Sequence, residues 1–216
     1  MLLYLHGFGS GPGSHKAQAL ARRFAELGVR MEVPDLTPGA DGFERSTPSS
    51  MRDVARAALA TGSPPHAIIG SSLGGYIAAT MAAEDRSIER LVLLAPAFRL
   101  FERWGARLGP ADLADWRAHG LETMHHASNR RRRIGWPFFE DAQGWPAFPF
   151  VTVPTLCIAG RRDDTVPLAD VEAFVERTPT ARLVVVDDGH ELAASLDRIF
   201  DEARAFLRPV PDRPPA

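Results

Sequence analysis

The 216-residue chain has little that would support disulfide chemistry or membrane insertion. Its single cysteine, Cys157, cannot form an intramolecular disulfide. No apolar run approaches the roughly 20 residues that a membrane-spanning helix needs. The first residues also lack the charged-then-apolar layout of a signal peptide. We therefore expect a cytoplasmic protein that does not bind a membrane.

The chain also lacks an excess of either charge. Its 25 basic and 27 acidic residues give a formal net charge of −2, so no overall basic field exists to hold nucleic acid. With 45% hydrophobic and 24% charged residues, the composition is that of a globular chain and excludes a disordered one. The length fits one α/β domain, which we predict at residues 1–208, followed by a flexible proline-rich tail at 209–216.

Apolar runs of strand length alternate with segments of helical period, which is typical of a parallel sheet covered by helices on both faces. Six strands are predicted, at Leu2–Leu5, Arg30–Val33, Ala67–Ile69, Leu91–Leu94, Thr155–Ala159 and Arg182–Val186. Helices are predicted at Lys16–Leu27, Ser49–Ala60, Leu73–Ala83, Leu168–Arg177 and Glu191–Leu207, with Ser14 and Ser49 as N-caps. The predicted fold class is α/β, with a six-stranded, mostly parallel sheet.

The alternation breaks between residues 97 and 150, where a simple crossover between strands needs only about a dozen residues. This segment holds all four tryptophans and six of the twelve phenylalanines. We predict an insertion that forms a lid over an apolar pocket. Its predicted substrate-binding residues are Trp104, Trp136, Phe138 and Trp145.

A serine flanked by glycines follows the third predicted strand. Gly70-Ser-Ser-Leu-Gly-Gly75 fits the pattern G-x-S-x-G with Ser72 at its centre, between a strand and a helix. A serine in such a sharp turn has strained backbone, and Gly70 and Gly74 remove side chains that would clash there. The pattern predicts Ser72 as a nucleophile and the Leu73 N–H, at a helix N-terminus, as a donor to an oxyanion.

A second glycine-rich segment, from His6 to Gly13, follows the first predicted strand. Its alternating glycines fit the phosphate-binding pattern G-x-G-x-x-G poorly. The better interpretation is the His-Gly-x loop of serine hydrolases, in which the Phe8 N–H is a second oxyanion donor. His6 itself is expected to be a buried histidine that braces the loop.

An acid and a histidine follow the last two predicted strands. Asp163 lies in the loop after Thr155–Ala159, and His190 lies in the loop after Arg182–Val186. Because ligands bind at the carboxyl edge of a parallel sheet, these side chains and Ser72 should converge on one crevice. We predict a catalytic triad of Ser72, Asp163 and His190.

Five motifs together resemble α/β-hydrolases, closest to the small YqiA-like esterases, over residues 1–207: Leu5-His-Gly-Phe-Gly-Ser, Ser14-His-Lys-Ala, Gly70-Ser-Ser-Leu-Gly-Gly-Tyr, Gly160-x-x-Asp-x-x-Val-Pro167 and Asp188-Gly-His190. The resemblance implies the α/β-hydrolase fold, with Asp163 rather than Asp164 as the triad acid. It also implies a serine hydrolase of small-molecule carboxylic or thio-esters that needs no cofactor. The aromatic insertion indicates an apolar substrate group of small to medium size.

Two other functions could use the same residues: a lyase that forms no acyl-enzyme, and a module that binds a small molecule without turnover. Metal binding has little support, because His125-His126 has no partners at zinc spacing. Lys16, the only lysine beside 24 arginines, and the run Arg130–Arg133 are expected to be solvated. Cys157 is expected to be a core residue, and no motif indicates an oligomeric state.

Overall fold

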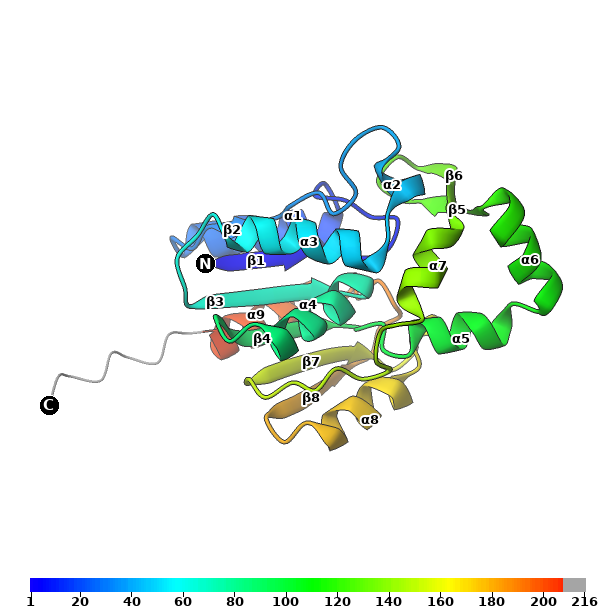
Figure 1. Cartoon of the computed structure of the whole chain (residues 1–216). Coiled ribbons are helices and arrows are strands. Elements are labelled where there is room, and N and C mark those ends of the chain that lie inside the picture. Colours follow the sequence, from blue (N-terminus) through cyan, green and yellow to red (C-terminus); the bar gives the residue numbers. More distant parts are fainter. Residues whose placement is uncertain (208–216) are drawn as a thin grey trace, which may run out of the picture.

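The computed structural model describes residues 1–207, and its centre is a six-stranded sheet (Figure 1). In the order in which they pair across the sheet, the strands are β2 (Met31–Glu32), β1 (Leu2–Leu5), β3 (His66–Ser71), β4 (Ile88–Leu94), β7 (Thr155–Gly160) and β8 (Ala181–Val186). Every pair of neighbouring strands is parallel. The predicted six-stranded sheet is therefore confirmed, and it is parallel throughout.

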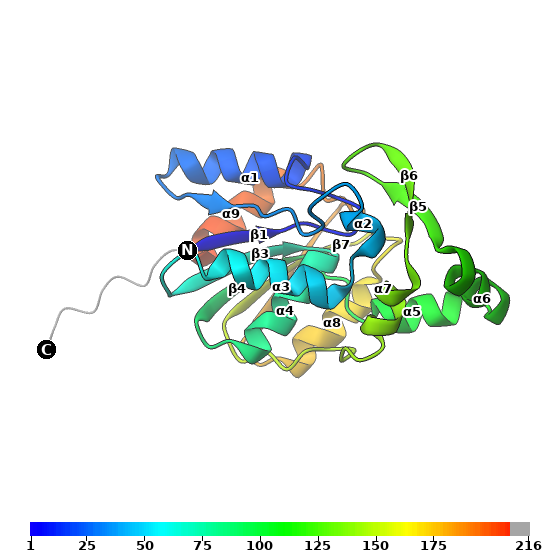
Figure 2. The same ribbon diagram turned by 45° about the horizontal axis from the view of Figure 1, so that its top comes forward.

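Helices cover both faces of the sheet (Figures 1 and 2). On one face, α1 (His15–Glu26) and α9 (Leu196–Leu207) pack over the side chains of Leu2 and Tyr4. On the other, α3 (Pro48–Leu59), α4 (Leu73–Glu84) and α8 (Leu168–Arg177) pack over those of Leu3 and Leu5. Successive side chains of a strand point to opposite faces of the sheet. One short apolar run therefore contributes to the hydrophobic core on each face.

A predicted N-cap and a predicted helix start are wrong, whereas the other predicted helix ends lie within one residue of those observed. Ser49 does not cap α3, which begins one residue earlier and is capped by Thr47, whose side-chain oxygen accepts from the Ser50 N–H at 3.0 Å. Ser49 Oγ instead donates to Asp141 Oδ1 in the insertion, at 2.7 Å. The last helix begins at Leu196 rather than Glu191, because Leu192 has a φ of +53° and interrupts the helical backbone.

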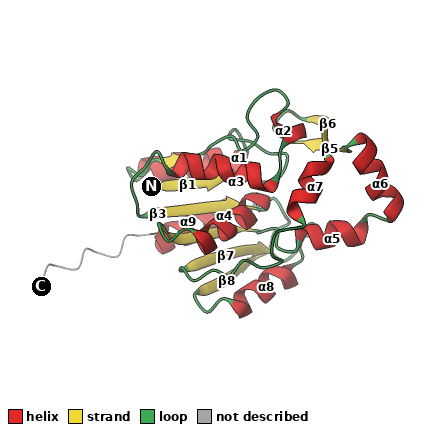
Figure 3. Cartoon of the chain, in the orientation of Figure 1, coloured by secondary structure: helices red, strands yellow, loops and turns green. Residues whose placement is uncertain are grey.

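The insertion at residues 97–150 consists mainly of three helices and a β-hairpin beside the carboxyl edge of the sheet (Figure 3). The helices are α5 (Leu100–Arg107), α6 (Pro110–His119) and α7 (Trp136–Ala142), and β5 (Leu121–His125) pairs antiparallel with β6 (Arg130–Ile134). The arginine run thus forms a strand, which its sequence did not predict, and three of its four side chains are exposed. A four-residue helix, α2 (Gly42–Arg45), was also not predicted, and it packs against β6.

An ionic contact fixes the base of the insertion to the body of the protein. Asp170 on α8 has a side chain that is only 10% exposed, and it accepts hydrogen bonds from Arg99 at 3.3 Å and from Arg103 on α5. A carboxylate so buried is stable only when it is paired, so α5 is held against α8.

The predicted tail at 209–216 lies outside the described residues. Among the helices within residues 1–207, none has the length and apolar character needed to cross a membrane.

The backbone of the turn between β3 and α4 is closely packed against neighbouring backbone atoms. Ser72 has a φ of +52°, a conformation that side chains rarely adopt. A Cβ at Gly74 would lie 2.2 Å from the Leu5 carbonyl oxygen, and a Cβ at Gly70 would lie 2.5 Å from the Gly74 carbonyl oxygen. The predicted steric need for both glycines is therefore confirmed.

We predict that Gly74→Ala lowers the free energy of unfolding by at least about 2 kcal/mol, because the added methyl group overlaps the backbone of β1. Gly13→Ala is the matched control, since a Cβ at Gly13 meets no atom within 4 Å. Its effect should stay within about 1 kcal/mol. Urea unfolding followed by circular dichroism measures both, and equal effects would contradict the packing argument.

Candidate active site

The candidate site lies at the carboxyl edge of the sheet, where the loops after β1, β3, β7 and β8 meet (Figure 1). These loops carry Phe8, Ser72, Asp163 and His190, respectively. Parallel strands direct their carboxyl ends to a single edge, so residues far apart in the sequence are neighbours here.

Ser72 is held by its backbone on both sides. Its N–H donates to the Leu94 carbonyl at 2.8 Å, and its own carbonyl accepts from Gly75 and Ala97 at 2.9 and 3.1 Å. These bonds hold the serine in its positive-φ conformation, which by itself costs on the order of 1–3 kcal/mol. The strained turn exposes the Ser72 side chain in the cavity described below.

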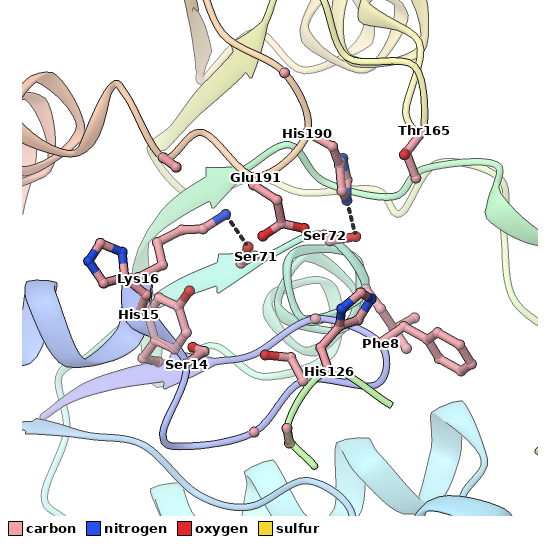
Figure 4. A pocket seen from close by; sticks show the side chains of 18 of the residues that line it. Phe8, Ser14, His15, Lys16, Ser71, Ser72, His126, Thr165, His190 and Glu191 are labelled. Carbon is pink, nitrogen blue, oxygen red and sulfur yellow. Dashed lines mark hydrogen bonds between the residues drawn. The ribbon is translucent and has the colours of Figure 1, made fainter. Parts of the chain in front are cut away.

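His190 connects the serine to an acid, and Figure 4 shows its hydrogen bond with Ser72. Its Nε2 lies 3.0 Å from Ser72 Oγ, and its Nδ1 lies 2.8 Å from Asp163 Oδ2. A carboxylate only accepts hydrogen bonds, so Nδ1 carries the hydrogen in the neutral ring and Nε2 can accept a proton from the hydroxyl. The three predicted triad side chains are thus within hydrogen-bond distance of one another in the order that proton transfer requires.

The two neighbouring aspartates have different surroundings. The Asp163 side chain is 1% exposed, and its second oxygen, Oδ1, accepts from the backbone N–H groups of Thr165 and Val166 at 2.9 and 2.7 Å. Burial raises the pKa of Asp163, but the bonds from His190 and these N–H groups outweigh burial and hold the pKa below its ordinary value. Asp164 is exposed, and among residues 1–207 it accepts only from the Thr165 hydroxyl, so of the two aspartates Asp163 is the one that reaches the histidine.

Phe8 and Leu73, whose N–H groups are the predicted oxyanion donors, line the same cavity as Ser72. Within residues 1–207, neither the Phe8 N–H nor the Leu73 N–H donates to a protein acceptor. The Leu73 N–H belongs to the first turn of α4, where the helix dipole adds positive potential. The loop after β1 passes close to the serine, because a Cβ at Gly7 would lie 3.3 Å from Ser72 Cβ. Both predicted oxyanion donors are therefore next to the candidate nucleophile.

A cavity of about 1030 Å³ opens over Ser72 and His190. One part of its wall is apolar and includes Phe8, Leu73, Leu100 and Trp104. Another part is polar and comes from β1, the N-cap and first turn of α1, the end of β3 and the loop after β8; it includes Tyr4, Ser14, His15, Lys16, Ser71, Asp188 and Glu191. The site is thus divided between apolar and charged surfaces.

Three of the four predicted substrate-binding aromatics do not line this cavity. Phe138 is fully buried and packs between Phe8 and Phe101, at ring distances of 5.3 and 5.9 Å. Trp136 packs on Trp116 and Phe139 within the insertion, and Trp145 packs on Tyr76 of α4. Only Trp104 reaches the cavity, because most of the aromatic surface is used to hold the insertion together and to the body of the protein.

Lys16, Tyr4 and Glu191 also line the cavity, and the sequence did not assign them to the site. Lys16 was expected to be solvated, but it is partly buried and its Nζ donates to Ser71 Oγ at 3.2 Å. Its position one turn from the glycine-rich loop was the available signal. For Tyr4, the available signal was its position in the strand that ends at the same loop, where successive side chains point to opposite faces of the sheet.

His6 and the cysteine have structural surroundings. His6 is fully buried, accepts from the Leu36 N–H at 3.1 Å and lies 3.1 Å from the Gly7 carbonyl, so it braces the loop as predicted. Burial lowers the pKa of His6. Cys157 is in the core as expected, and burial raises the pKa of its thiol. In the described part of the chain, no three His, Cys, Asp or Glu side chains are grouped as metal ligands.

Comparisons with known proteins agree with this arrangement. The model of a family described as "Uncharacterised protein family (UPF0227)" matches residues 1–207. A pimeloyl-[acyl-carrier protein] methyl ester esterase of Xanthomonas oryzae pv. oryzae is 28% identical over 252 aligned positions, which cover 97% of this chain and 96% of that protein.

Solved structures share the fold. Alpha/beta hydrolase domain-containing protein 10 from mouse superimposes with a TM-score of 0.75 at 18% identity, over 94% of this chain and 88% of that one. Est1E from Butyrivibrio proteoclasticus, solved with ferulic acid, gives a TM-score of 0.79 at 23% identity, over 95% and 86% of the two chains. The predicted resemblance is confirmed: the chain belongs to the UPF0227 family and has the α/β-hydrolase fold.

Proposed function

We propose that this protein is a serine esterase that cleaves small-molecule carboxylic or thio-esters with small to medium apolar acyl groups, and that it needs no cofactor. The observation that carries this proposal is the position of His190, 3.0 Å from Ser72 Oγ and 2.8 Å from Asp163 Oδ2. The Xanthomonas relatives, which are named as methyl ester esterases, support the same class of reaction. The cytoplasmic location expected from the sequence stays a prediction.

The proposed reaction has two stages. Ser72 Oγ attacks the ester carbonyl carbon while His190 Nε2 takes the hydroxyl proton, and Asp163 stabilises the imidazolium that forms. His190 then gives the proton to the leaving alcohol or thiol, which leaves an acyl group on Ser72. A water molecule, deprotonated by the same histidine, attacks the acyl-enzyme and releases the acid.

The negative charge that develops on the carbonyl oxygen needs donors in fixed positions. The N–H groups of Phe8 and Leu73 suit this role, because both residues line the cavity and neither N–H has an acceptor within residues 1–207. One such donor is worth about 10²–10³ in rate in enzymes of this chemistry.

The apolar part of the cavity wall supports a substrate with an apolar acyl group. Phe8 contacts Trp104, with ring centroids 5.5 Å apart and an interplanar angle of 81°, and the two side chains form a rigid surface beside Ser72. Trp104 in turn packs on Phe138 and Trp116, so the insertion supports this surface from behind. Such a wall suits small and medium acyl groups better than long lipid chains.

We predict that Ser72→Ala lowers kcat for 4-nitrophenyl butyrate by at least about 10⁴-fold, because no other group near His190 replaces the nucleophile. A fluorophosphonate probe should add one adduct to the wild type and to Ser71→Ala, but none to Ser72→Ala. Intact-protein mass spectrometry measures the adduct. Labelling that persists in Ser72→Ala would refute the assignment of the nucleophile.

Asp163→Asn should lower kcat by about 10⁴-fold, because the amide can stabilise the wrong tautomer of His190. Asp164→Asn is the matched control and should cost less than about tenfold, since Asp164 has no contact with the histidine. Steady-state kinetics on variants with similar thermal midpoints gives the comparison. The reverse order of effects would make Asp164 the acid.

Esters with about two to eight acyl carbons should exceed long-chain esters in kcat/KM by at least about tenfold, which is about 1.4 kcal/mol of transition-state binding. Trp104→Phe should reduce this preference, whereas Trp136→Phe, which changes an indole outside the cavity, should leave it in place. A series of 4-nitrophenyl esters in clear solution tests both variants. A preference for emulsified long-chain esters would contradict the proposed acyl size.

A further inference from the structure

Lys16 is the only lysine of the chain, and it lines the cavity. Its side chain is partly buried and makes one hydrogen bond, to Ser71 Oγ at 3.2 Å. Within residues 1–207, no carboxylate oxygen lies within 4.0 Å of its Nζ, although 24 arginines supply most of the ion pairs elsewhere. An ammonium group has three donors, so Lys16 retains capacity for a ligand in the cavity.

Burial makes the charged form of Lys16 energetically unfavourable as long as no anion pairs with it. Burial lowers the pKa of Lys16, and the negative charges of Glu191, Asp188 and Asp163 oppose that effect from longer range. A partly buried cation without a close partner gains more from a bound anion than a solvated lysine does. Glu191 is itself exposed and can turn into solvent when a ligand enters.

The cation lies on the opposite side of the candidate nucleophile from the apolar wall. In Figure 4, Lys16 and His15 lie on one side of Ser72, and Phe8 lies on the other. Lys16 belongs to the first turn of α1, which contains no acidic residue and adds the positive end of a helix dipole to this side. A substrate bound across Ser72 therefore meets an apolar surface at one end and a positive charge at the other.

We propose that Lys16 binds a free carboxylate which the substrate carries in addition to its ester, so that the preferred substrates are acidic esters such as monoesters of dicarboxylic acids. This inference rests on the proposed esterase function. A singly charged carboxylate suits this place better than a doubly charged phosphate, because the nearby charges of Glu191 and Asp188 repel the phosphate more strongly. The role of Lys16 is specificity, and the triad acts on the ester as before.

Matched pairs of esters test this proposal. Monomethyl succinate, glutarate and adipate carry a carboxylate where methyl butyrate, pentanoate and hexanoate carry a methyl group. Butyryl glycolate, paired with ethyl butyrate in the same way, places the charge on the alcohol side. The wild type should favour the acidic member of at least one pair in kcat/KM. Lys16→Met should reduce that preference by at least about tenfold, the value of a hydrogen bond between charged groups.

Two further variants separate binding from a general effect. Lys16→Arg should keep part of the preference, because it retains the charge. Arg22→Met removes one positive charge from an exposed position of the same helix, outside the cavity, and should leave the preference unchanged. An equal loss for both members of each pair in Lys16→Met would mean that Lys16 only supports the structure, and the proposal would be wrong. A wild type without preference for any acidic ester would also overturn it.

Binding to Ser72→Ala distinguishes failure of this inference from failure of the esterase function. Calorimetry should give tighter binding of the acidic ester than of its neutral partner, and Lys16→Met in that background should remove the difference. A difference in binding without turnover by the wild type would refute the esterase and keep the carboxylate site. Turnover of neutral and acidic esters at equal rates, with equal binding, would keep the esterase and refute the carboxylate site.

Discussion

The contact between the start of α4 and the backbone at the end of β1 is the constraint on which the rest of the site depends. Only glycine at position 74 permits it, because a Cβ there would lie 2.2 Å from the Leu5 carbonyl oxygen. The approach leaves Ser72 with a φ of +52°, and its bonds to Leu94 and Ala97 offset the strain. The buried helix that follows keeps this turn in place, so the hydroxyl has a fixed position at the cavity.

The acid and the histidine are fixed by a similar contact between two loops. A Cβ at Gly160 would lie 2.5 Å from the Asp188 carbonyl oxygen, and the Arg162 N–H donates to the same carbonyl at 2.9 Å. The loops after β7 and β8 are therefore in close contact. This contact keeps His190 Nδ1 2.8 Å from Asp163 Oδ2. Rigid support of this kind is what a proton-transfer chain needs, because its hydrogen bonds tolerate little displacement.

The insertion contributes less to the cavity than its aromatic content indicates. Its side chains mainly contact one another and the body of the protein: Trp116 lies under Trp104 and Phe139, and the Tyr76 hydroxyl donates to the Pro146 carbonyl at 2.5 Å. An insertion of this length needs most of its apolar side chains for its own hydrophobic core, so few of them remain to contact a ligand. The cavity consequently combines an apolar wall, to which the insertion contributes Leu100 and Trp104, with a polar wall to which α1 contributes Lys16.

The sequence by itself determined the alternation of strands and helices outside the insertion and the position of the nucleophile turn, because both depend on local properties: short apolar runs, and glycines spaced around Ser72. It did not determine which apolar side chains would reach the cavity. The hydrophobic periodicity of a helix indicates which of its faces is buried, but not which other element covers that face. The sequence therefore could not show that Phe138 is buried in the core while Trp104 lines the cavity. The same reason applies to Lys16, whose burial depends on β3 and on the loop after β8, both remote in sequence. Tertiary structure alone decided these contacts, since each joins elements that are separated by long stretches of chain.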